Sequence, residues 1–286
     1  MRFVTFNVLH GQVMAGGRPV AGAVGGPGES GALGEVVGGL GADVVALQEV
    51  DRGQERSGRV DQARAAAEAG GFGEWRYGAA VHGRSVPGEG WALDPGAPEL
   101  GVYGPGDAGG PPAHGVVLMS RLPVRRWRAR RLPPAPVGLP LRVAGRRGLV
   151  PVRDQPRAAL AAVLAGGQGP FTVVALHLSF VPGWNVRQLR AVRRWIADLP
   201  RPHLLLGDFN LIGAAPRAVL NGPRGAGPWR DLARTATYPA HRPRVQFDHV
   251  LAAGLPAATV RAAVRGAHAP AVPVSDHRPL VVDLDV

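Results

Sequence analysis

The stretch His203-Leu204-Leu205-Leu206-Gly207-Asp208-Phe209-Asn210 places three consecutive leucines before a glycine, an acid and an amide. A short apolar run that ends at a turn signal is typical of a buried strand, and such a strand carries the polar residues after it to one edge of a sheet. Asp208 and Asn210 are therefore candidates for a functional site. Considered alone, the same two residues are equally compatible with an ordinary turn after a core strand.

Apolar segments that end in polar residues recur along the chain. A strand predicted over 2–9 contains Asn7, and a second predicted over 43–49 ends at Glu49. Three later segments repeat the pattern, with the polar residues His177, Asp248 with His249, and Asp276 with His277. Because carboxylates gathered at one rim are costly to bury, we expect a cation or a phosphate group to neutralise them.

The composition favours one globular domain without thiol chemistry. The chain has 286 residues, 45% of them hydrophobic, which is enough to fill a large core. No run approaches the ~20 apolar residues of a membrane span, and a strand-like segment stands where a signal peptide would, so we expect a cytoplasmic protein without a membrane span. Cysteine is absent, so any metal must be held by oxygen or imidazole ligands.

The net charge of +12 suits a phosphate-rich partner such as nucleic acid. However, no lysine occurs, and the chain is rich in arginine, with 42 glycines and 28 prolines. This composition is typical of a GC-rich genome, which explains part of the charge without any function. The segment Arg121 to Arg131, in which Trp127 is interleaved, is the best candidate for tracking a phosphate backbone.

Periodicity and turn residues predict the other elements. Helices are predicted over 32–40, 61–69 and 186–199, the last two capped by Asp61 and Asn185. Strands are predicted over 124–132 and over 259–265, which is rich in alanine and valine. The glycine- and proline-rich residues 82–114 are predicted to form a long loop or insertion within a single domain, 1–286.

Seven segments, in order, resemble the endonuclease/exonuclease/phosphatase superfamily, whose archetype is deoxyribonuclease I. They are Thr5-Phe6-Asn7, Leu47-Gln48-Glu49, Gly115 to Arg121, His177-Leu178-Ser179, Gly207-Asp208-Phe209-Asn210, Phe247-Asp248-His249-Val250 and Ser275-Asp276-His277-Arg278-Pro279. Gly-Asp-x-Asn or Ser-Asp-His alone is a weak signal, but the ordered set covers nearly the whole chain. The resemblance implies an α/β (α+β) fold, a four-layer sandwich of two face-to-face mixed β-sheets flanked by helices.

The resemblance also implies a Mg²⁺- or Mn²⁺-dependent phosphoric ester hydrolase and suggests its metal ligands. Glu49, supported by Asn7, resembles the principal metal ligand, and oxygen donors of this kind suit a hard cation. Asp208 and Asp276 are the further candidate ligands. Asp208 would in addition orient or deprotonate the attacking water, or alternatively protonate the leaving oxygen.

The remaining catalytic roles are likewise carried over from the resemblance. Asn210 would hold the scissile phosphate. His277, oriented by Asp276, would act as a general base or stabilise charge on the phosphate, because a carboxylate behind an imidazole fixes its tautomer and basicity. His177, paired with Asp248, would donate to the phosphate or to the leaving group.

Two secondary matches resemble a bacterial subgroup of the superfamily. His10 lies in an Asn-x-x-His-Gly sequence and is either a rim residue of the site or a turn histidine. Arg157 ends an Asp-Gln-Pro-Arg sequence that resembles Asp-Glu-Pro-Arg, and it lies either beside the phosphate or on an ordinary surface. Val116 replaces an asparagine that many members carry, so no polar contact is expected there. The other histidines are expected to be structural or exposed: His82, His114, His203, His241, His249 and His268.

The leading functional hypothesis is hydrolysis of a phosphodiester bond by activated water, in a nuclease that acts on DNA or RNA. The alternative is a phosphodiesterase or phosphatase that acts on a lipid headgroup or on a small phosphorylated metabolite, since the superfamily uses one catalytic core for many substrates. An inactive binding scaffold is the least favoured hypothesis, because none of the core positions is missing. On the resemblance alone, we expect a monomer.

Overall fold

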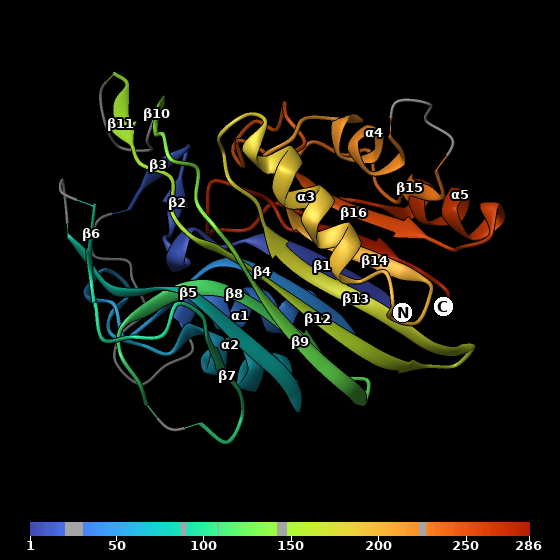
Figure 1. Cartoon of the computed structure of the whole chain (residues 1–286), viewed down its shortest axis with the longest axis horizontal. Coiled ribbons are helices and arrows are strands. Elements are labelled where there is room, and N and C mark those ends of the chain that lie inside the picture. Colours follow the sequence, from blue (N-terminus) through green and yellow to red (C-terminus); the bar gives the residue numbers. More distant parts are fainter. Residues whose placement is uncertain (21–30, 87–89, 108, 142–147, 223–226) are drawn as a thin grey trace.

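Two mixed β-sheets pack face to face, and helices cover the outer surface of each sheet (Figure 1). The computed structural model describes residues 1–20, 31–86, 90–107, 109–141, 148–222 and 227–286. This arrangement confirms the four-layer α/β sandwich that the sequence motifs implied.

The first sheet contains one parallel strand pair among antiparallel neighbours. Its strand order is β17-β1-β4-β8-β5-β6, and β7 pairs with β5. Its strands are β1 (Arg2–Asn7), β4 (Val44–Arg52), β5 (Glu74–Val86), β6 (Gly90–Leu93), β7 (Gly101–Tyr103), β8 (Ala113–Ser120) and β17 (Leu280–Asp283). Because β1 and β4 run parallel, their carboxyl ends reach the same edge of the sheet.

The second sheet repeats this design. Its strand order is β15-β16-β14-β13-β12-β9. Its strands are β9 (Val124–Leu132), β12 (Arg157–Gly166), β13 (Gly169–His177), β14 (His203–Asp208), β15 (Trp229–Asp231) and β16 (Asp248–Ala253). The parallel pair is β13 and β14, whose register aligns their last residues, His177 and Asp208. The leucines at positions 204–206 therefore lie in β14, in the interior of this sheet.

The other elements are short. The helices are α1 (Gly31–Gly39), α2 (Gln62–Gly70), α3 (Trp184–Trp195), α4 (Ala215–Asn221) and α5 (Ala257–Gly266), with 3₁₀ turns η1 (Leu9–Gly11) and η2 (Glu55–Ser57). Two small sheets pair β2 (Met14–Ala15) with β3 (Arg18–Pro19) and β10 (Leu139–Leu141) with β11 (Val150–Val152). Among the residues that the structure describes, no helix combines the length and the apolarity needed to cross a membrane.

Three apolar layers hold the sandwich together. Alternate residues of the strands, such as Leu118 and Leu206, point into the layer between the two sheets. On the other face of the first sheet, Val45 packs in the layer that α1 and α2 cover. On the other face of the second sheet, Leu205 packs against Leu189 of α3. Because side chains alternate between the two faces of a strand, every second residue points into the layer between the sheets.

The three predicted helices are confirmed in outline, but one predicted helix cap and one predicted strand are wrong. Asp61 caps α2 as predicted, because its carboxylate accepts the backbone N–H of Arg64. Asn185 does not cap α3, which begins after Gly183; its side chain instead donates to the backbone oxygen of Asn210. Residues 259–265, predicted as a strand, belong to α5.

The error at α5 has a simple physical origin. Alanine and valine dominate this segment, and a short run of small apolar residues does not distinguish a strand from a helix. In the structure Val260 and Ala263, three positions apart, both face the core, while Arg261 and Arg265 are exposed. This spacing is that of a helix lying on a core.

The segment 82–114, predicted as a long loop or insertion, contains three short stretches of strand besides the start of β8. β5 continues to Val86 and forms an antiparallel arm with β6, in which Ser85 lies opposite Trp91. β7 adds a further pair to β5. One glycine of this segment serves the sheet, since a Cβ at Gly83 would overlap the backbone of Ala92. The strand prediction over 124–132 is confirmed by β9.

Gly207 is required by the close approach of β14 to β13, because a Cβ there would overlap the carbonyl oxygen of Leu176. We expect Gly207→Ala to lower the free energy of unfolding by roughly 1–3 kcal/mol or more, as overpacking does. Urea unfolding measures this change. The matched control is Gly39→Ala in α1, where no heavy atom lies within 4 Å of the added Cβ. Equal stability of the two variants would contradict this account.

Candidate active site

The carboxyl edges of the two parallel pairs meet at one end of the sandwich, and Asn7 joins them. Its side-chain nitrogen donates to Oε1 of Glu49 in the first sheet and to Oδ2 of Asp208 in the second, both at 3.1 Å. The side-chain oxygen of Asn7, Oδ1, accepts the backbone N–H of Leu9 at 3.2 Å. The structure therefore brings Asn7, Glu49 and Asp208 together, as the sequence motifs predicted.

Glu49 reaches this position through a β-bulge. The register between β4 and β8 shifts between Gln48 and Val50, and Glu49 has a φ of 58°. The bulge displaces its side chain from the strict alternation of β4. Gln62 stabilises the neighbouring backbone, because its amide accepts the N–H of Asp51 and donates to the carbonyl of His10.

Left-handed backbone is concentrated around this site. Six non-glycine residues among those described have a positive φ. One of them, Arg59, lies away from the site. The other five lie in or beside the segments that carry the site residues: Leu9, His10, Glu49, Asn210 and Ser275. Such conformations cost energy and cluster at functional sites, where the surrounding contacts impose them. Ser275 illustrates those contacts, since its hydroxyl donates to the backbone oxygen of Asn7 and accepts the N–H of His277.

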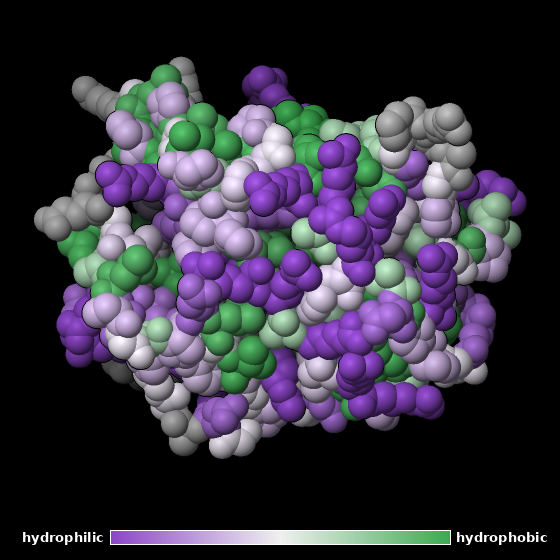
Figure 2. All heavy atoms as spheres, in the orientation of Figure 1, coloured by the Kyte–Doolittle hydropathy of each residue, from purple (hydrophilic) through white to green (hydrophobic). Residues whose placement is uncertain are grey.

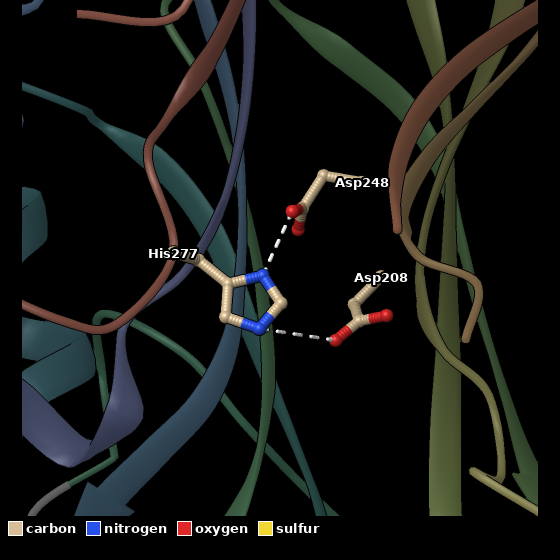
Figure 3. A group of neighbouring side chains, drawn as sticks. All are labelled: Asp208, Asp248 and His277. Atoms are coloured by element: carbon tan, nitrogen blue, oxygen red, sulfur yellow. Dashed lines mark hydrogen bonds and ion pairs between the residues drawn. The ribbon is translucent and has the colours of Figure 1, made fainter. Parts of the chain in front are cut away.

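His277 pairs with Asp248, which corrects two expected pairings. Nδ1 of His277 lies 2.8 Å from Oδ2 of Asp248, and Nε2 points toward Asp208, 4.0 Å away (Figure 3). The expected partner of His277 was Asp276, and Asp248 was expected to pair with His177. Asp248 is the first residue of β16 and lies opposite Asp208 in the register of β14 and β16. Its carboxylate faces the loop that carries His277.

Asp276 and His249 lie elsewhere around the site. The carboxylate of Asp276 makes no side-chain hydrogen bond within the described residues, and burial raises its pKa, with the charge of Glu49 adding to the effect. It therefore stands near Glu49 as a second, largely buried acid. His249 points away and its Nε2 contacts the backbone oxygen of Leu211 at 2.9 Å, a structural role that agrees with the expectation.

The pKa values of Asp208 and His277 are both raised above their ordinary values. Burial raises the pKa of Asp208 to about 7, and the charge of Asp248 adds to this rise. Burial works to lower the pKa of His277, but the charge of Asp248 and its hydrogen bond outweigh it and raise that pKa to about 10. At neutral pH, His277 is therefore a cation beside a carboxyl group that can take up or release a proton.

Glu49 has the properties of a cation ligand. Burial works to raise its pKa, but the positive charge around it, including that of Arg157, and the hydrogen bond from Asn7 outweigh burial and lower the pKa to about 2. Its carboxylate is thus ionised, partly open to solvent, and bonded by one amide donor, that of Asn7. A hard divalent cation fits the oxygens of this carboxylate, whereas Asn7 directs its amide nitrogen toward Glu49 and its side-chain oxygen toward the N–H of Leu9.

A second possible ligand group consists of Asp208, Asp248 and His277, whose nearest ligand atoms lie within 4.8 Å of one another (Figure 3). Two of its members already satisfy each other, because Asp248 accepts from His277 and from the hydroxyl of Thr237. A hard cation also prefers oxygen to imidazole nitrogen. The group is therefore better suited to moving protons, and the Glu49 side of the site is better suited to the cation.

His177 and Asn210 lie on the other side of Asp208. Nε2 of His177 is 3.7 Å from Oδ2 of Asp208 and 3.4 Å from the side-chain nitrogen of Asn210. Nδ1 of His177 lies 3.0 Å from Nη1 of Arg157, the first residue of β12. The structure thus brings Arg157 to the site, in agreement with the functional interpretation of its sequence match.

A group of side chains beside Glu49 was missed in the sequence. Asp51 is fully buried and accepts two bonds from Arg56, at 2.7 and 2.8 Å, and one from Nδ1 of His114, at 2.7 Å. Trp91 of the β6 arm covers this group, with its ring 5.0 Å from the guanidinium of Arg56. His114 was expected to be structural or exposed, and its buried bond to Asp51 is a structural role; its place directly before the matching segment at Gly115 was the available signal that it lies near the site.

His10 lies at the rim of the same group. Burial, and then the charge of Arg56, lower the pKa of His10 to about 4, so its imidazole is neutral at neutral pH. A neutral rim histidine can donate or accept one hydrogen bond from a substrate.

Known proteins share this fold. The model of the Endonuclease/Exonuclease/phosphatase family matches residues 4–277. An endonuclease/exonuclease/phosphatase from Beutenbergia cavernae has a TM-score of 0.61 and 22% identity, with 100% of this chain and 71% of that chain covered. A mannosyl-6-phosphatase from Bacteroides thetaiotaomicron has a TM-score of 0.55 and 13% identity, with 100% of both chains covered. Sphingomyelinase C from Streptomyces griseocarneus has a TM-score of 0.51 and 16% identity, with 100% and 99% covered. No curated protein sequence matches the chain.

The raised pKa of His277 makes stability depend on pH. A folded-state pKa of about 10, against 6.5 for the free side chain, contributes stability that is complete below pH 6.5 and is lost as the pH rises to 10. In chelator, we expect the wild type to lose a few kcal/mol more unfolding free energy between pH 7 and 10 than His277→Gln does. Urea unfolding at several pH values measures this difference.

The matched control for this experiment is His268→Gln, which changes an exposed histidine. It should keep the pH dependence of the wild type. Parallel pH profiles for the wild type and His277→Gln would show that His277 does not hold an extra proton in the folded state.

Proposed function

The chain belongs to the endonuclease/exonuclease/phosphatase family, and we propose that it is a divalent-cation-dependent phosphodiesterase. The observation that carries the proposal is the meeting of a buried Asp–His pair with a carboxylate pair bridged by one amide. Asp248 and His277 form the first pair, and Asn7 bridges Glu49 and Asp208. Hydrolysis of a phosphoric ester needs both parts, one to move protons and one to hold a cation against the phosphate.

The cation would be Mg²⁺ or Mn²⁺, held by the carboxylate of Glu49, with that of Asp276 close by. When bound, it neutralises charge on the phosphate and lowers the pKa of a coordinated water. Asn7 fixes the geometry of this site, because both of its amide hydrogens are used to hold the two carboxylates.

Asp208 is proposed as the general base. A pKa raised to about 7 by burial and by the charge of Asp248 matches the requirement that a base release and accept its proton near the working pH. Oδ2 of Asp208 accepts from Asn7, and Oδ1 accepts the backbone N–H of Asn210 at 2.9 Å. These two bonds hold the carboxyl group in one orientation. Asp208 would therefore take a proton from the attacking water.

His277 is proposed to act on the opposite side of the reacting phosphate as a protonated donor. Asp248 fixes Nδ1–H and leaves Nε2–H free to point into the site. The charge of Asp276 also favours the protonated ring, which supplies a role for this acid other than the direct bond first expected. Nε2–H would stabilise negative charge on the phosphate or give its proton to the leaving oxygen.

Nucleic acid is the proposed substrate class. The net charge is +12, and exposed arginines lie on α3 and on β9, which share one face of the molecule (Figure 1). Figure 2 shows hydrophilic side chains over much of this face. β9 ends at Leu132, which lies opposite Arg157 in the register of β12, so this surface leads to the edge that holds the site. A phosphate backbone could follow it.

Small phosphoric esters are the second candidate substrate class. The specific observation in their favour is the contact of Arg56 with Trp91 beside Glu49, which offers a cation and an aromatic ring to a small ligand on the side of the first sheet. The names of two similar structures, a mannosyl-6-phosphatase and a sphingomyelinase C, agree with this range. An inactive scaffold is disfavoured because the strand-tip residues form one connected hydrogen-bonded site.

Asp208→Asn and His277→Ala test the proton-transfer roles. We expect each to lower kcat by about 10²- to 10⁴-fold, which is the usual contribution of general acid–base groups. Steady-state hydrolysis of a bis-aryl phosphodiester with Mg²⁺ measures the change. The controls are Asp198→Asn and His268→Ala, which alter exposed residues of the same types. Folded variants of Asp208 and His277 that keep most of the wild-type activity would contradict the assignment.

A substrate and metal screen tests the function itself. Purified protein is assayed with plasmid DNA, single-stranded RNA, a bis-aryl phosphodiester and a phosphomonoester, each with Mg²⁺, Mn²⁺ or chelator. We expect cation-dependent cleavage of nucleic acid that chelator abolishes. Activity confined to the small esters would replace the nuclease proposal with the second candidate, and inactivity on every substrate with either metal would contradict the phosphoesterase proposal.

A further inference from the structure

The two histidines of the site have opposite partners on Nδ1. Nδ1 of His277 faces a carboxylate, that of Asp248, at 2.8 Å. Nδ1 of His177 faces a guanidinium, that of Arg157, at 3.0 Å. A carboxylate accepts hydrogen bonds and a guanidinium only donates them, so the two rings must carry their hydrogens differently.

We propose that Arg157 is a positioning residue that holds His177 as the neutral tautomer with its hydrogen on Nε2. The inference rests on the proposed phosphodiesterase function and deepens it. His177 then serves as a fixed hydrogen-bond donor to a phosphate oxygen and does not transfer a proton. Proton transfer is left to Asp208 and His277.

The hydrogen-bond chemistry of Arg157 leads directly to this tautomer. Arginine does not give up its proton in proteins, so Nη1 can approach Nδ1 of His177 to 3.0 Å only as a donor. Nδ1 must therefore present a lone pair, and the one hydrogen of a neutral ring lies on Nε2.

The surroundings of Nε2 fit a donor. The side-chain nitrogen of Asn210, 3.4 Å away, also only donates and would favour a lone pair on Nε2, but this contact is longer than the 3.0 Å contact of Arg157 with Nδ1, and the amide already donates to the backbone oxygen of Leu178 at 2.9 Å. The carboxylate of Asp208 is the neighbouring acceptor, at 3.7 Å, which is too long for a direct hydrogen bond. Nε2–H therefore points toward Asp208 but forms no hydrogen bond with it. The hydrogen remains available for donation to a phosphate oxygen.

Charge and burial disfavour the alternative, a doubly protonated ring. His177 is 3% exposed, and an imidazolium would bring a second positive charge against the guanidinium of Arg157. Burial lowers the pKa of His177 well below its ordinary value, and the charge of Arg157 lowers it further. The ring therefore stays neutral while the neighbouring His277 stays charged.

Arg157 has further capacity to bind an anion. Its Nε is buried and has no hydrogen-bond partner among the described residues. An unsatisfied buried donor is costly unless a ligand completes it. A phosphate oxygen placed beside His177 would supply the missing acceptor, so one arginine would orient the histidine and help to bind the same phosphate.

Nitrogen-15 NMR of the histidine rings tests the tautomer directly. The full chain, labelled on its imidazole nitrogens, is measured at neutral pH in chelator and again with Mg²⁺, and His177→Gln assigns the His177 signals. We expect a pyridine-like shift for Nδ1 and a pyrrole-like shift for Nε2 in the wild type. A pyrrole-like Nδ1, or two equivalent protonated nitrogens, would overturn the proposal.

Three variants then test whether Arg157 is the cause. Arg157→Met should lose the uniform Nδ1 and Nε2 shifts of His177, and Arg157→Lys, which can still donate, should restore them in part. Arg153→Met, an exposed arginine four residues earlier, should leave them unchanged. Unchanged His177 shifts in folded Arg157→Met would overturn the role of Arg157.

The other histidines report whether Arg157→Met is folded, since the chain has nine. If that variant unfolds, the wild-type shifts and the Arg157→Lys spectrum still decide the question. The measurement needs no turnover, so a wrong tautomer and a wrong enzymatic function give separate results.

Discussion

The side-chain amide of Asn7 fixes the relation between the two sheets at the edge where the polar residues gather. Its nitrogen donates to Glu49 of the first sheet and Asp208 of the second, at 3.1 Å each. An amide nitrogen carries two hydrogens, so both are used and the side chain has one orientation. Because its two partners belong to different sheets, the packing of the whole sandwich sets the separation of these carboxylates. The site is therefore complete only when both sheets are folded and docked.

Around this bridge, the fold uses strained backbone and burial to give similar groups different properties. The bulge and positive φ at Glu49 place that carboxylate among positive charges, which lower its pKa to about 2. Asp208, inside the inter-sheet edge, has a pKa raised to about 7 by burial. One acid is thus suited to a cation and the other to a proton. Such separation of pKa values within one cluster is the usual basis for assigning acid and base roles.

The sequence predicted which residues gather better than how they pair. Period-two alternation and ordered motifs placed Glu49, Asp208 and His277 at strand ends, and parallel strands carry their ends to one edge. The partner of His277 could not be chosen locally. Asp276 is adjacent along the chain, whereas Asp248 begins β16 of the second sheet and His277 precedes β17 of the first, so only the packing of the two sheets decides between them. His114 was missed because its partner Asp51 lies in a different strand.

Glu49, whose carboxylate Asn7 bridges to Asp208, is proposed to bind the divalent cation. Isothermal titration of the metal-free protein with Mn²⁺ tests this proposal most directly, with wild type compared against Glu49→Gln and against Glu55→Gln, an exposed acid paired only with Arg59. The account predicts that Glu49→Gln loses Mn²⁺ binding while Glu55→Gln binds as the wild type does. Equal Mn²⁺ affinity of folded Glu49→Gln and the wild type would contradict it.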